Sequence, residues 1–473
     1  MKVCFIAEGC YPYVVGGVSS WIHSMIKSFP EIEFSIIAVI ADRSQSKKFV
    51  YELPDNLVEV YEVYLNDEDW SDKRKGQSNE RFSFFHLPRR MNQALEGLLL
   101  NKDIDWATIF EMFENDQMSI NELLMSPTFL HAVDDYYSRK YQSTSFTDFL
   151  WTLRSMYAPL FLSMQIDPPK ADVYHCVATG YSGIIGSMAK LRNPGSRLVI
   201  SEHGIYTRER EEELIKAKWV QGAYKDIWIE QFYKMSQCAY DNADVVTSLY
   251  QHARDLQIEF GCPENKAVIT PNGIRTEKFN NIPQKDEKDE NINVGAVLRI
   301  TPIKDIKTMI NAFHLARLKN PKLKLYVMGP DDEDKAYAEE CYRLVEELKE
   351  TGIEFCGSVD VSQYLGKMDF LLLTSLSEGQ PLTILEGFAA KRPTISTNVG
   401  NCYGLIYGED GDELGAAGIV VPVMNVQAIS SAILELADEK EKCQEMGEVG
   451  YKRLYNKYLI EMMINRYREI YYK

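Results

Sequence analysis

Two glutamates near the C-terminal end of the chain, Glu378 and Glu386, carry the strongest chemical signal in the sequence. They lie in the segment SLSEGQPLTILEG, residues 375–387, with seven residues between them. Carboxylates accept hydrogen bonds from hydroxyl groups, such as those of a sugar or a ribose. The structural alternative is that Glu378 caps a helix and Glu386 is solvated.

The residues around the two glutamates predict how they are positioned. The apolar run Phe370–Leu373 is typical of a buried parallel strand. Gly379 permits a tight turn, and Pro381 suits the first turn of a helix, where its missing N–H costs no hydrogen bond. We expect that helix to run through Glu386 towards Ala390. Its free N–H groups and the positive end of its dipole would then form a phosphate-binding site beside both carboxylates. This combination suits a sugar nucleotide.

A pair of cations follows a second predicted strand. Arg299 and Lys304 lie in GAVLRITPIKD, residues 295–305, on either side of a proline turn. If they converge on a diphosphate, they would neutralise the charge that builds on a leaving nucleotide. The alternative is two surface cations, one of them paired with Asp305.

The N-terminal half offers a glycine pair and a histidine. Gly16 and Gly17 precede a predicted helix and would let backbone approach a ligand closely, although they can equally form a simple turn. The segment lacks the Gly-x-Gly-x-x-Gly dinucleotide fingerprint, which argues against an NAD enzyme. His203, in SEHGIYTRER, follows a predicted strand and could bond a sugar hydroxyl or the backbone as a neutral imidazole. The alternative is a histidine in a turn. His175 occupies a similar place and is a weaker candidate, on a loop or the acceptor side.

Size and composition exclude several classes of protein. A chain of 473 residues is too long for one core, so two domains are expected. The net charge of −17 argues against nucleic-acid binding. We find neither a signal peptide nor an apolar run near the roughly 18 residues of a membrane helix. Nine scattered cysteines favour the reduced cytosol, and the seven histidines show no metal-ligand spacing, so no metal is expected.

Short apolar strands alternate with amphipathic helices at both ends of the chain, the pattern of parallel α/β sheets. Strands are expected at 2–7, 34–40, 173–175, 198–201, 245–247 and 267–269, and then at 292–297, 323–328, 353–355, 370–373, 394–396 and 419–421. The polar segment 280–291 is predicted to be a surface linker. The expected domains are 1–280, with a helical insertion at about 67–168, and 281–455. The helix of 456–473 would either cross back to the first domain or cover the second sheet.

Together these residues resemble the retaining, family-4 type of nucleotide-sugar glycosyltransferase, which has the GT-B fold. The matching pieces span nearly the whole chain: Gly16-Gly17-Val18, Glu202-His203-Gly204, Pro271-Asn272-Gly273-Ile274, Arg299 with Lys304, Gly329-Pro330, and the segment from Glu378 to Glu386. The stretches EGCYPYVVGGVSSW (8–21) and EHGIYTRER (202–210) look like a narrower group, the cytosolic glycosyltransferases of Pel exopolysaccharide synthesis. One departure is Lys391-Arg392-Pro393, where the family often has a glycine before a Lys-Pro pair. This difference affects only the C-cap of a helix and not the chemistry.

The resemblance implies two Rossmann-like domains facing a cleft and a role for each candidate residue. Arg299 and Lys304 would hold the diphosphate, Glu386 the ribose hydroxyls and Glu378 the donor hexose. His203 would lie near the donor sugar and the acceptor. The backbone of the loop would complete the sugar and phosphate contacts, through Gly379, Gln380, Pro381, Leu382 and Thr383. Gly16 and Gly17 would let the first domain close over the diphosphate, and the base would lie against the segment around Gly357.

The activity implied is transfer of a hexose from a UDP-sugar to a polysaccharide acceptor, with UDP-glucose as the favoured donor and a UDP-N-acetylhexosamine as a serious competitor. Neither a tightly bound cofactor nor a metal is implied, and the expected partners are inner-membrane proteins of Pel synthesis and export that recruit a cytoplasmic enzyme. A nucleotide-sugar epimerase or a phosphorylase on the same fold is an alternative, although no lysine context for a pyridoxal cofactor is evident. A non-catalytic scaffold is the third possibility, and the joint presence of Arg299, Lys304, Glu378 and Glu386 argues against it.

Overall fold

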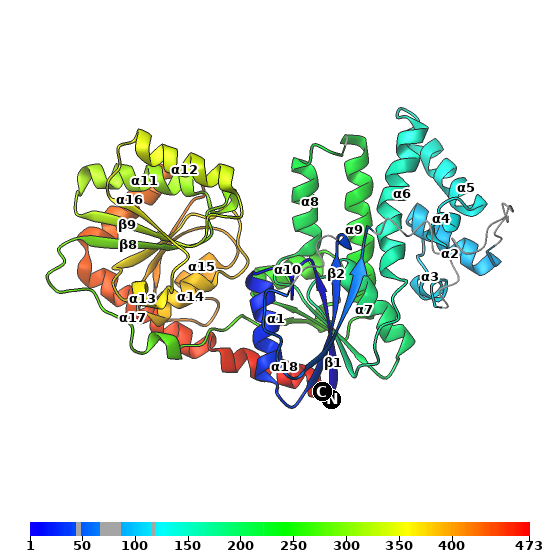
Figure 1. Cartoon of the computed structure of the whole chain (residues 1–473), viewed down its shortest axis with the longest axis horizontal. Helices are drawn as coiled ribbons and strands as arrows, with labels where there is room; N and C mark the ends of the chain where they lie inside the picture. The colour runs from blue at the N-terminus through cyan, green and yellow to red at the C-terminus, as the bar shows by residue number, and fades with distance from the viewer. Residues whose placement is uncertain (44–48, 67–86, 115–118, 221) are drawn as a thin grey trace. The chain divides into compact units, whose positions relative to one another are not determined.

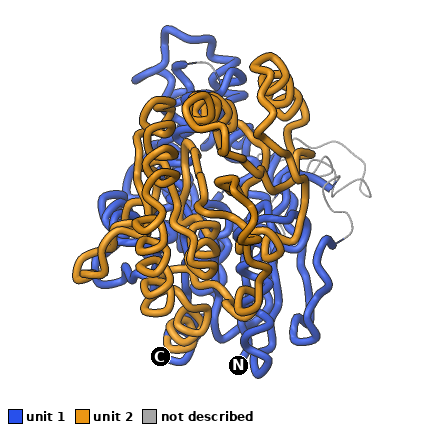
Figure 2. Tube along the Cα trace, turned by 90° about the vertical axis from the view of Figure 1, so that its left-hand side faces the viewer, with its two compact units in different colours: residues 1–269, 470–473 blue, residues 270–469 orange. Residues whose placement is uncertain are grey.

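The structure is a computed structural model that describes residues 1–43, 49–66, 87–114, 119–220 and 222–473. The chain forms two compact units, residues 1–269 with 470–473, and residues 270–469 (Figures 1 and 2). The boundary expected after residue 280 lies inside the second unit. Ile282 is buried in that unit's core, and the Lys285 ammonium pairs with Asp369, so 280–291 packs on this unit.

Unit 1 is built on a parallel sheet of seven strands in the order β3-β2-β1-β4-β5-β6-β7. Their bounds are β1 Lys2–Glu8, β2 Glu33–Ile40, β3 Leu57–Tyr64, β4 Val173–Cys176, β5 Arg197–Ser201, β6 Val245–Ser248 and β7 Ala267–Ile269. The apolar run of β1 is buried at the centre of the sheet, where both faces are covered. The sequence prediction missed β3, an edge strand whose exposed positions include Glu59 and Glu62.

Helices cover this sheet, and a further group of helices, the expected insertion, packs beside them. Those that follow the strands are α1 Gly17–Ser28, α7 Tyr181–Arg192, α8 Tyr206–Lys216, α9 Gly222–Asn242, α10 Gln251–Glu259 and the short η4 Glu264–Lys266. The expected insertion between β3 and β4 is helical where it is described, and Figure 1 shows it packed beside α9. It contains α2 Arg89–Leu100, α3 Trp106–Glu111, α4 Ile120–Leu123, α5 Pro127–Tyr136, the π-helical η3 Tyr137–Tyr141 and α6 Phe146–Ser163. Residues 67–86 and 115–118 lie outside the described residues.

Unit 2 is built on a parallel sheet of six strands in the order β10-β9-β8-β11-β12-β13. The strands are β8 Ile292–Val297, β9 Leu323–Met328, β10 Ile353–Gly357, β11 Phe370–Leu373, β12 Thr394–Thr397 and β13 Gly418–Val421. Its helices are η5 Glu277–Phe279, η6 Pro302–Lys304, α11 Ile306–Lys319, α12 Lys335–Glu347, α13 Ser362–Leu365, α14 Leu382–Ala389, α15 Cys402–Tyr407, α16 Val426–Asp438, α17 Lys440–Lys457 and α18 Ile460–Tyr472. The predicted fold class, two Rossmann-like parallel sheets, is confirmed.

The last helix, α18, ends in unit 1. The hydroxyl of Tyr471 lies 2.6 Å from His175 Nδ1, and its ring packs near Phe29. His175 is fully buried, and its Nε2 lies 2.7 Å from Ser201 Oγ, so this histidine joins β4, β5 and the C-terminal residues. Within the described ranges, no helix has the length and apolarity needed to cross a bilayer.

Candidate functional site

The strand order places a switch point in each sheet. In unit 2 the order reverses between β8 and β11, and open α/β sheets bind ligands beyond the carboxyl ends of strands at such a point. The segments that leave these strands run together: Leu376 N donates to Ile303 O at 2.8 Å, and Thr374 Oγ1 donates to Lys304 O at 2.9 Å. The switch point therefore brings one predicted cation, Lys304, beside one predicted glutamate, Glu378, whereas Arg299 and Glu386 pair with other residues.

Lys304 and Glu378 form an ion pair at this point. The ammonium lies 2.5 Å from Glu378 Oε1, and the side chains are only 17% and 12% exposed. Pro381, not Glu378, is the N-cap of α14, and no side chain caps that helix end. Glu378 is thus directed to Lys304 rather than to the helix. An ammonium has three donors and a carboxylate has several acceptor sites, so both groups keep hydrogen-bonding capacity beyond their mutual contact.

Glu386 lies within α14 and pairs with a lysine that the sequence prediction did not single out. Its Oε1 is 2.9 Å from Lys278 Nζ, and the glutamate side chain is 19% exposed, so it is not simply solvated. Lys278 belongs to η5, a few residues after the Pro271–Ile274 motif. A lone lysine after that motif gives little signal in the sequence, because nothing local shows that it meets α14.

Arg299 is more exposed than Lys304. Its guanidinium pairs with Glu333, and both side chains are about half exposed, so neither predicted cation pairs with Asp305. Gly329, at the end of β9, packs its Cα against Leu298 O and donates its N–H to Gly357 O at 2.8 Å. Gly357, at the end of β10, adopts a positive φ of 67°. Because Gly329 contacts both Leu298 and Gly357, this turn lies at the same sheet edge as Arg299.

The loop from Gly379 to Thr383 is held from two sides. Gln380 Oε1 accepts from Asn272 N at 2.9 Å, and its Nε2 donates to Asn272 O at 3.1 Å. Asn401 N donates to Gly379 O at 2.8 Å. The Gln380 amide therefore binds the backbone of the Pro271–Ile274 motif, and Leu382 and Thr383 begin α14 beyond it.

In unit 1, His203 packs against the helix that the glycine pair begins. Its ring is edge-on to Trp21 of α1, with 4.6 Å between ring centroids. Burial lowers the pKa of His203 to about 4, so the imidazole is neutral near pH 7. Its Nε2 is buried and has no hydrogen-bond partner among the residues that the structure describes. Gly16 is the N-cap of α1, and a Cβ at Gly16 or Gly17 would meet no atom within 4 Å.

His203 lines a pocket of about 280 Å³ at the switch point of the first sheet, between β1 and β4. Glu8, the last residue of β1, lies in it and accepts from Tyr206 Oη at 3.2 Å and from Ser182 N at 3.3 Å. Burial raises the pKa of Glu8, and burial raises that of Glu209 to about 7. The sequence prediction assigned these two carboxylates no role, although the position of Glu8 at a strand's carboxyl end was a usable signal.

The remaining expectations concern His175 and metals. His175 does not line this pocket, and burial lowers its pKa to about 3, so it is a neutral structural residue. Over the described part of the chain, no group of histidine, cysteine, aspartate and glutamate side chains is arranged to hold a metal ion.

Comparisons with known proteins agree with this architecture. Residues 1–265 match the family described as "Domain of unknown function (DUF3492)", and residues 291–439 match "Glycosyl transferases group 1". The putative glycosyltransferase EpsD of Bacillus subtilis is 22% identical over 306 residues, 62% of this chain and 74% of EpsD. The capsular polysaccharide biosynthesis glycosyltransferase CapM of Staphylococcus aureus is 25% identical over 218 residues, 44% of this chain and 56% of CapM. HepE of Anabaena, solved in complex with UDP and glucose, shares the fold with a TM-score of 0.59, 13% identity and 99% coverage of both chains.

Proposed function

The chain belongs to the DUF3492 family and carries a glycosyl transferases group 1 segment, and from this premise we propose that it transfers a hexose from a UDP-sugar to a growing exopolysaccharide, with retention of configuration. The observation that carries the proposal is the Lys304–Glu378 pair at the β8/β11 switch point, with Glu386 on the helix that follows. An ammonium and two carboxylates beside a helix start suit a diphosphate joined to two hydroxyl-rich rings.

Each candidate side chain in unit 2 has a proposed role in donor binding. Lys304 gives a second donor to a diphosphate oxygen while it holds Glu378, and Arg299 adds a charge-assisted contact. Glu386 accepts from the ribose hydroxyls, with Lys278 fixing its other oxygen. Glu378 accepts from a hexose hydroxyl. The backbone from Gly379 to Thr383, whose N–H donors exclude Pro381, completes the contacts to sugar and phosphate, and the base lies against Gly357.

The reaction needs no carboxylate nucleophile on the protein. The bond from the anomeric carbon to the diphosphate oxygen breaks, and the acceptor hydroxyl forms its bond to the same face of that carbon. The acceptor proton passes to the leaving diphosphate oxygen, whose charge Lys304 and Arg299 stabilise. Neutral His203, from unit 1, hydrogen-bonds the donor sugar or the acceptor, and Gly16 with Gly17 lets backbone approach the diphosphate.

The finer identity we propose is that of PelF, a cytoplasmic glycosyltransferase recruited to the membrane by Pel synthesis and export proteins. The segments 8–21 and 202–210 support it by their resemblance, and the relative CapM, a capsular polysaccharide biosynthesis glycosyltransferase, supports a role in polysaccharide synthesis. UDP-glucose is the favoured donor, with a UDP-N-acetylhexosamine as the competitor.

A UDP-release assay across a panel of nucleotide sugars, with and without acceptor oligosaccharide, tests the proposal. We expect acceptor-stimulated release of UDP from one donor, and NMR of the product should show the anomeric configuration of the donor. An altered sugar with no new glycoside would establish an epimerase instead. Absence of turnover with every donor would support the non-catalytic scaffold, and an inverted product would overturn the mechanism.

A further inference from the structure

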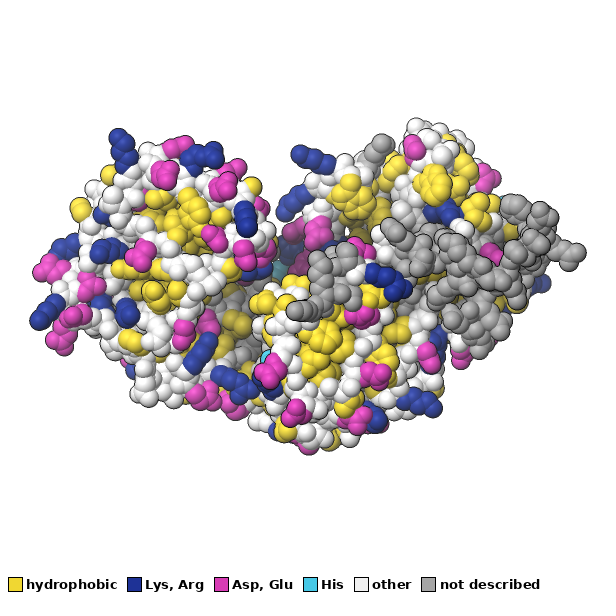
Figure 3. All heavy atoms as spheres, in the orientation of Figure 1, with side chains coloured by type: hydrophobic (Ala, Val, Ile, Leu, Met, Phe, Trp, Pro, Cys, Tyr) yellow, Lys and Arg dark blue, Asp and Glu magenta, His cyan; other side chains and the backbone are white. Residues whose placement is uncertain are grey.

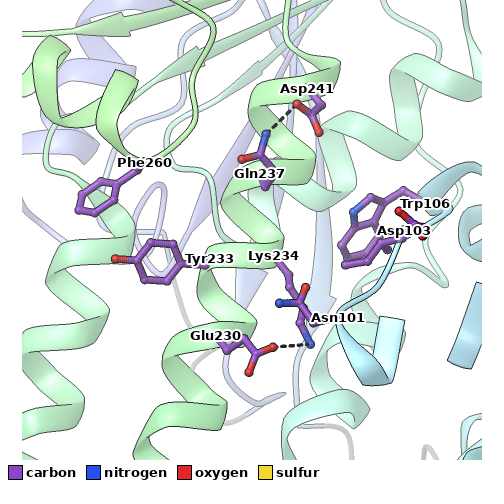
Figure 4. Close-up of a pocket in the computed structure, with 10 residues that line it drawn as sticks. Asn101, Asp103, Trp106, Glu230, Tyr233, Lys234, Gln237, Asp241 and Phe260 are labelled. Carbon is purple, nitrogen blue, oxygen red and sulfur yellow. Dashed lines mark hydrogen bonds and ion pairs between the residues drawn. The ribbon is translucent and has the colours of Figure 1, made fainter. Parts of the chain in front are cut away.

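A second pocket in unit 1 has the chemistry of a saccharide site. It has a volume of about 350 Å³, at the lower end of the range for ligand pockets, and shares no lining residue with the pocket of His203. It lies between the start of the helical insertion and α9, so one of its walls is formed by the part of the chain whose role the sequence left open. Figure 4 shows the side chains that line it.

Aromatic rings flank this pocket on two sides. Tyr233 and Phe260 meet edge-to-face with 5.5 Å between ring centroids, and Trp106 lies on the other side of α9 in Figure 4. Tyr233 is 36% exposed, and the other two rings are partly exposed. The electron-rich face of an aromatic ring attracts the C–H groups of a sugar ring, which carry partial positive charge. The flanking rings can therefore hold pyranose faces.

Polar side chains of α9 form the floor between the rings. Glu230, Lys234, Gln237 and Asp241 follow one another at spacings of three and four residues and so lie on one helix face. Gln237 Nε2 donates to Asp241 Oδ1 at 2.8 Å, which leaves the carboxylate further acceptor sites. This floor can accept hydrogen bonds from sugar hydroxyls.

The charge of the lining selects against anions. Three carboxylates, those of Asp103, Glu230 and Asp241, line the pocket together with a single ammonium, that of Lys234. A nucleotide diphosphate or a phosphate would be repelled here, whereas neutral or cationic groups would not. The pocket is thus unsuited to the donor that we propose for unit 2 and suited to a neutral or amino sugar.

The opposite wall is held in an uncommon backbone conformation. Asn101 and Asp103, directly after α2, have φ values of 54° and 42°, which side chains other than asparagine and aspartate seldom adopt. Lys234 Nζ donates to Leu98 O at 3.0 Å and so fixes the end of α2 from α9. Such conformations persist where surrounding structure holds them, often at functional sites. Here the lysine positions the loop that carries Asp103 over the pocket.

We propose that this pocket binds one or two sugar residues of a saccharide chain, separately from the site of transfer. The choice of a saccharide rests on the proposed function, whereas the preference for a neutral or cationic hydroxyl-rich ligand rests on the lining alone. The site would hold a section of the acceptor or product chain that is not reacting. Retention of that section raises the effective concentration of the chain end at the site of transfer.

Calorimetric titration of the full chain with tetrasaccharides of glucose, galactose, N-acetylglucosamine and glucosamine tests this proposal. At least one of them should bind, and Trp106→Ala and Tyr233→Ala should each weaken that binding by at least tenfold. Trp151→Ala is the matched control, because Trp151 is 61% exposed on α6 and does not line the pocket. Thermal unfolding confirms that each variant folds. No binding by any tetrasaccharide, or equal binding by all variants, would overturn the proposal.

Asp241→Asn distinguishes a neutral sugar from an amino sugar as the ligand, and it leaves the aromatic side chains of the pocket in place. If the ligand is an amino sugar, this variant should lower affinity for the glucosamine tetramer and leave that for the neutral tetramers within twofold. If the ligand is neutral, affinity for the neutral tetramer should fall instead; no change with any tetramer counts against the site. UDP release is measured in parallel. Tetrasaccharide binding without UDP release would refute the proposed function alone, and the reverse result would refute this pocket alone.

Discussion

At the residue scale, our proposal for the candidate site depends on the ion pair between Lys304 and Glu378. Both charges are mostly removed from water. The desolvation cost of such a pair is offset only if its geometry is good and its remaining hydrogen bonds are satisfied. Lys304 provides both the contact to Glu378 and, in our proposal, a contact to the diphosphate. Its loss should therefore affect binding of the nucleotide itself.

The first prediction concerns that lysine. Lys304→Ala should weaken UDP binding roughly 10- to 100-fold, because a hydrogen bond to a charged group is worth about 1.5–3 kcal/mol. Calorimetric titration with UDP measures the change. Lys307→Ala is the control, since Lys307 lies nearby but pairs with Glu340 on the exposed surface. Unchanged UDP affinity in Lys304→Ala would show that the diphosphate binds elsewhere.

A second prediction separates the two glutamates. Glu386→Ala should chiefly weaken binding of UDP and the UDP-sugar, because its carboxylate is assigned to the ribose. Glu378→Ala should chiefly lower kcat, because its carboxylate is assigned to the transferred hexose. UDP affinity and steady-state kinetics of both variants measure the difference. An equal loss of UDP affinity in the two variants contradicts this division of roles.

At the element scale, α9 is the helix that ties the insertion to the first sheet. Its Lys234 is buried, with the ammonium 3.0 Å from Leu98 O of α2 and 3.4 Å from Tyr157 Oη of α6. Burial lowers the pKa of this lysine to about 8, which Glu230 opposes only in part. A buried cation with so low a pKa links the stability of these helices to pH.

The third prediction follows from that linkage. Between pH 8 and pH 10.5 the unfolded chain binds more protons at Lys234 than the folded chain does, so this residue makes the free energy of unfolding rise with pH. The rise should amount to roughly 3 kcal/mol, at about 1.4 kcal/mol per pKa unit. Lys234→Met should remove it.

Denaturant unfolding at pH 7 to 10 measures this effect as the difference between the native chain and the variant. Lys225→Met, in the same helix, is the control, because the Lys225 ammonium donates to Ile215 O near the exposed surface. Parallel pH curves for the native chain and Lys234→Met would contradict the assignment.

At the scale of the whole molecule, the chain returns to its first unit at its end. Residues 470–473 belong to unit 1, although the helix that carries them, α18, begins in unit 2. Tyr471 is buried and hydrogen-bonds His175, which lies on β4 beside β1. The C-terminal residues therefore contribute to the core of unit 1, although most of α18 belongs to unit 2.

The fourth prediction tests that contribution. Tyr471→Phe should lower the free energy of unfolding of unit 1 by about 1–3 kcal/mol, because it removes the 2.6 Å contact to a buried ring nitrogen. Tyr472→Phe is a matched control, since that neighbouring tyrosine is 56% exposed. Denaturant unfolding followed by a probe in unit 1 measures both. Equal stability of the two variants would mean that the hydroxyl of Tyr471 adds nothing.

The distribution of side-chain types on the face drawn in Figure 3 does not indicate a functional site. Hydrophobic, acidic and basic side chains are interspersed over the face drawn in Figure 3, without one charged region that marks a function. The informative groups are partly buried at the edges of the two sheets. The net charge of −17 argues against nucleic acid as a partner, but it does not locate a site.

The sequence by itself determined the strands, because a parallel strand buried on both faces needs a continuous apolar run that can be recognised locally. It failed at β3, where only part of one face is buried and Glu59 and Glu62 interrupt the pattern. It also singled out Glu378, Arg299 and Lys304 as candidates, since each closely follows a strand, and Glu386, which lies within the helix that begins after Glu378.

Only the tertiary structure decided which of these groups meet. The strand order puts β11 beside β8, so Lys304 pairs with Glu378 across a separation of 74 residues. The same packing brings Lys278 to Glu386 and Gln380 to the backbone of Asn272. The pocket on α9 also depends on helices far apart in sequence. Such contacts are set by topology and side-chain packing, and no local pattern of residues encodes them.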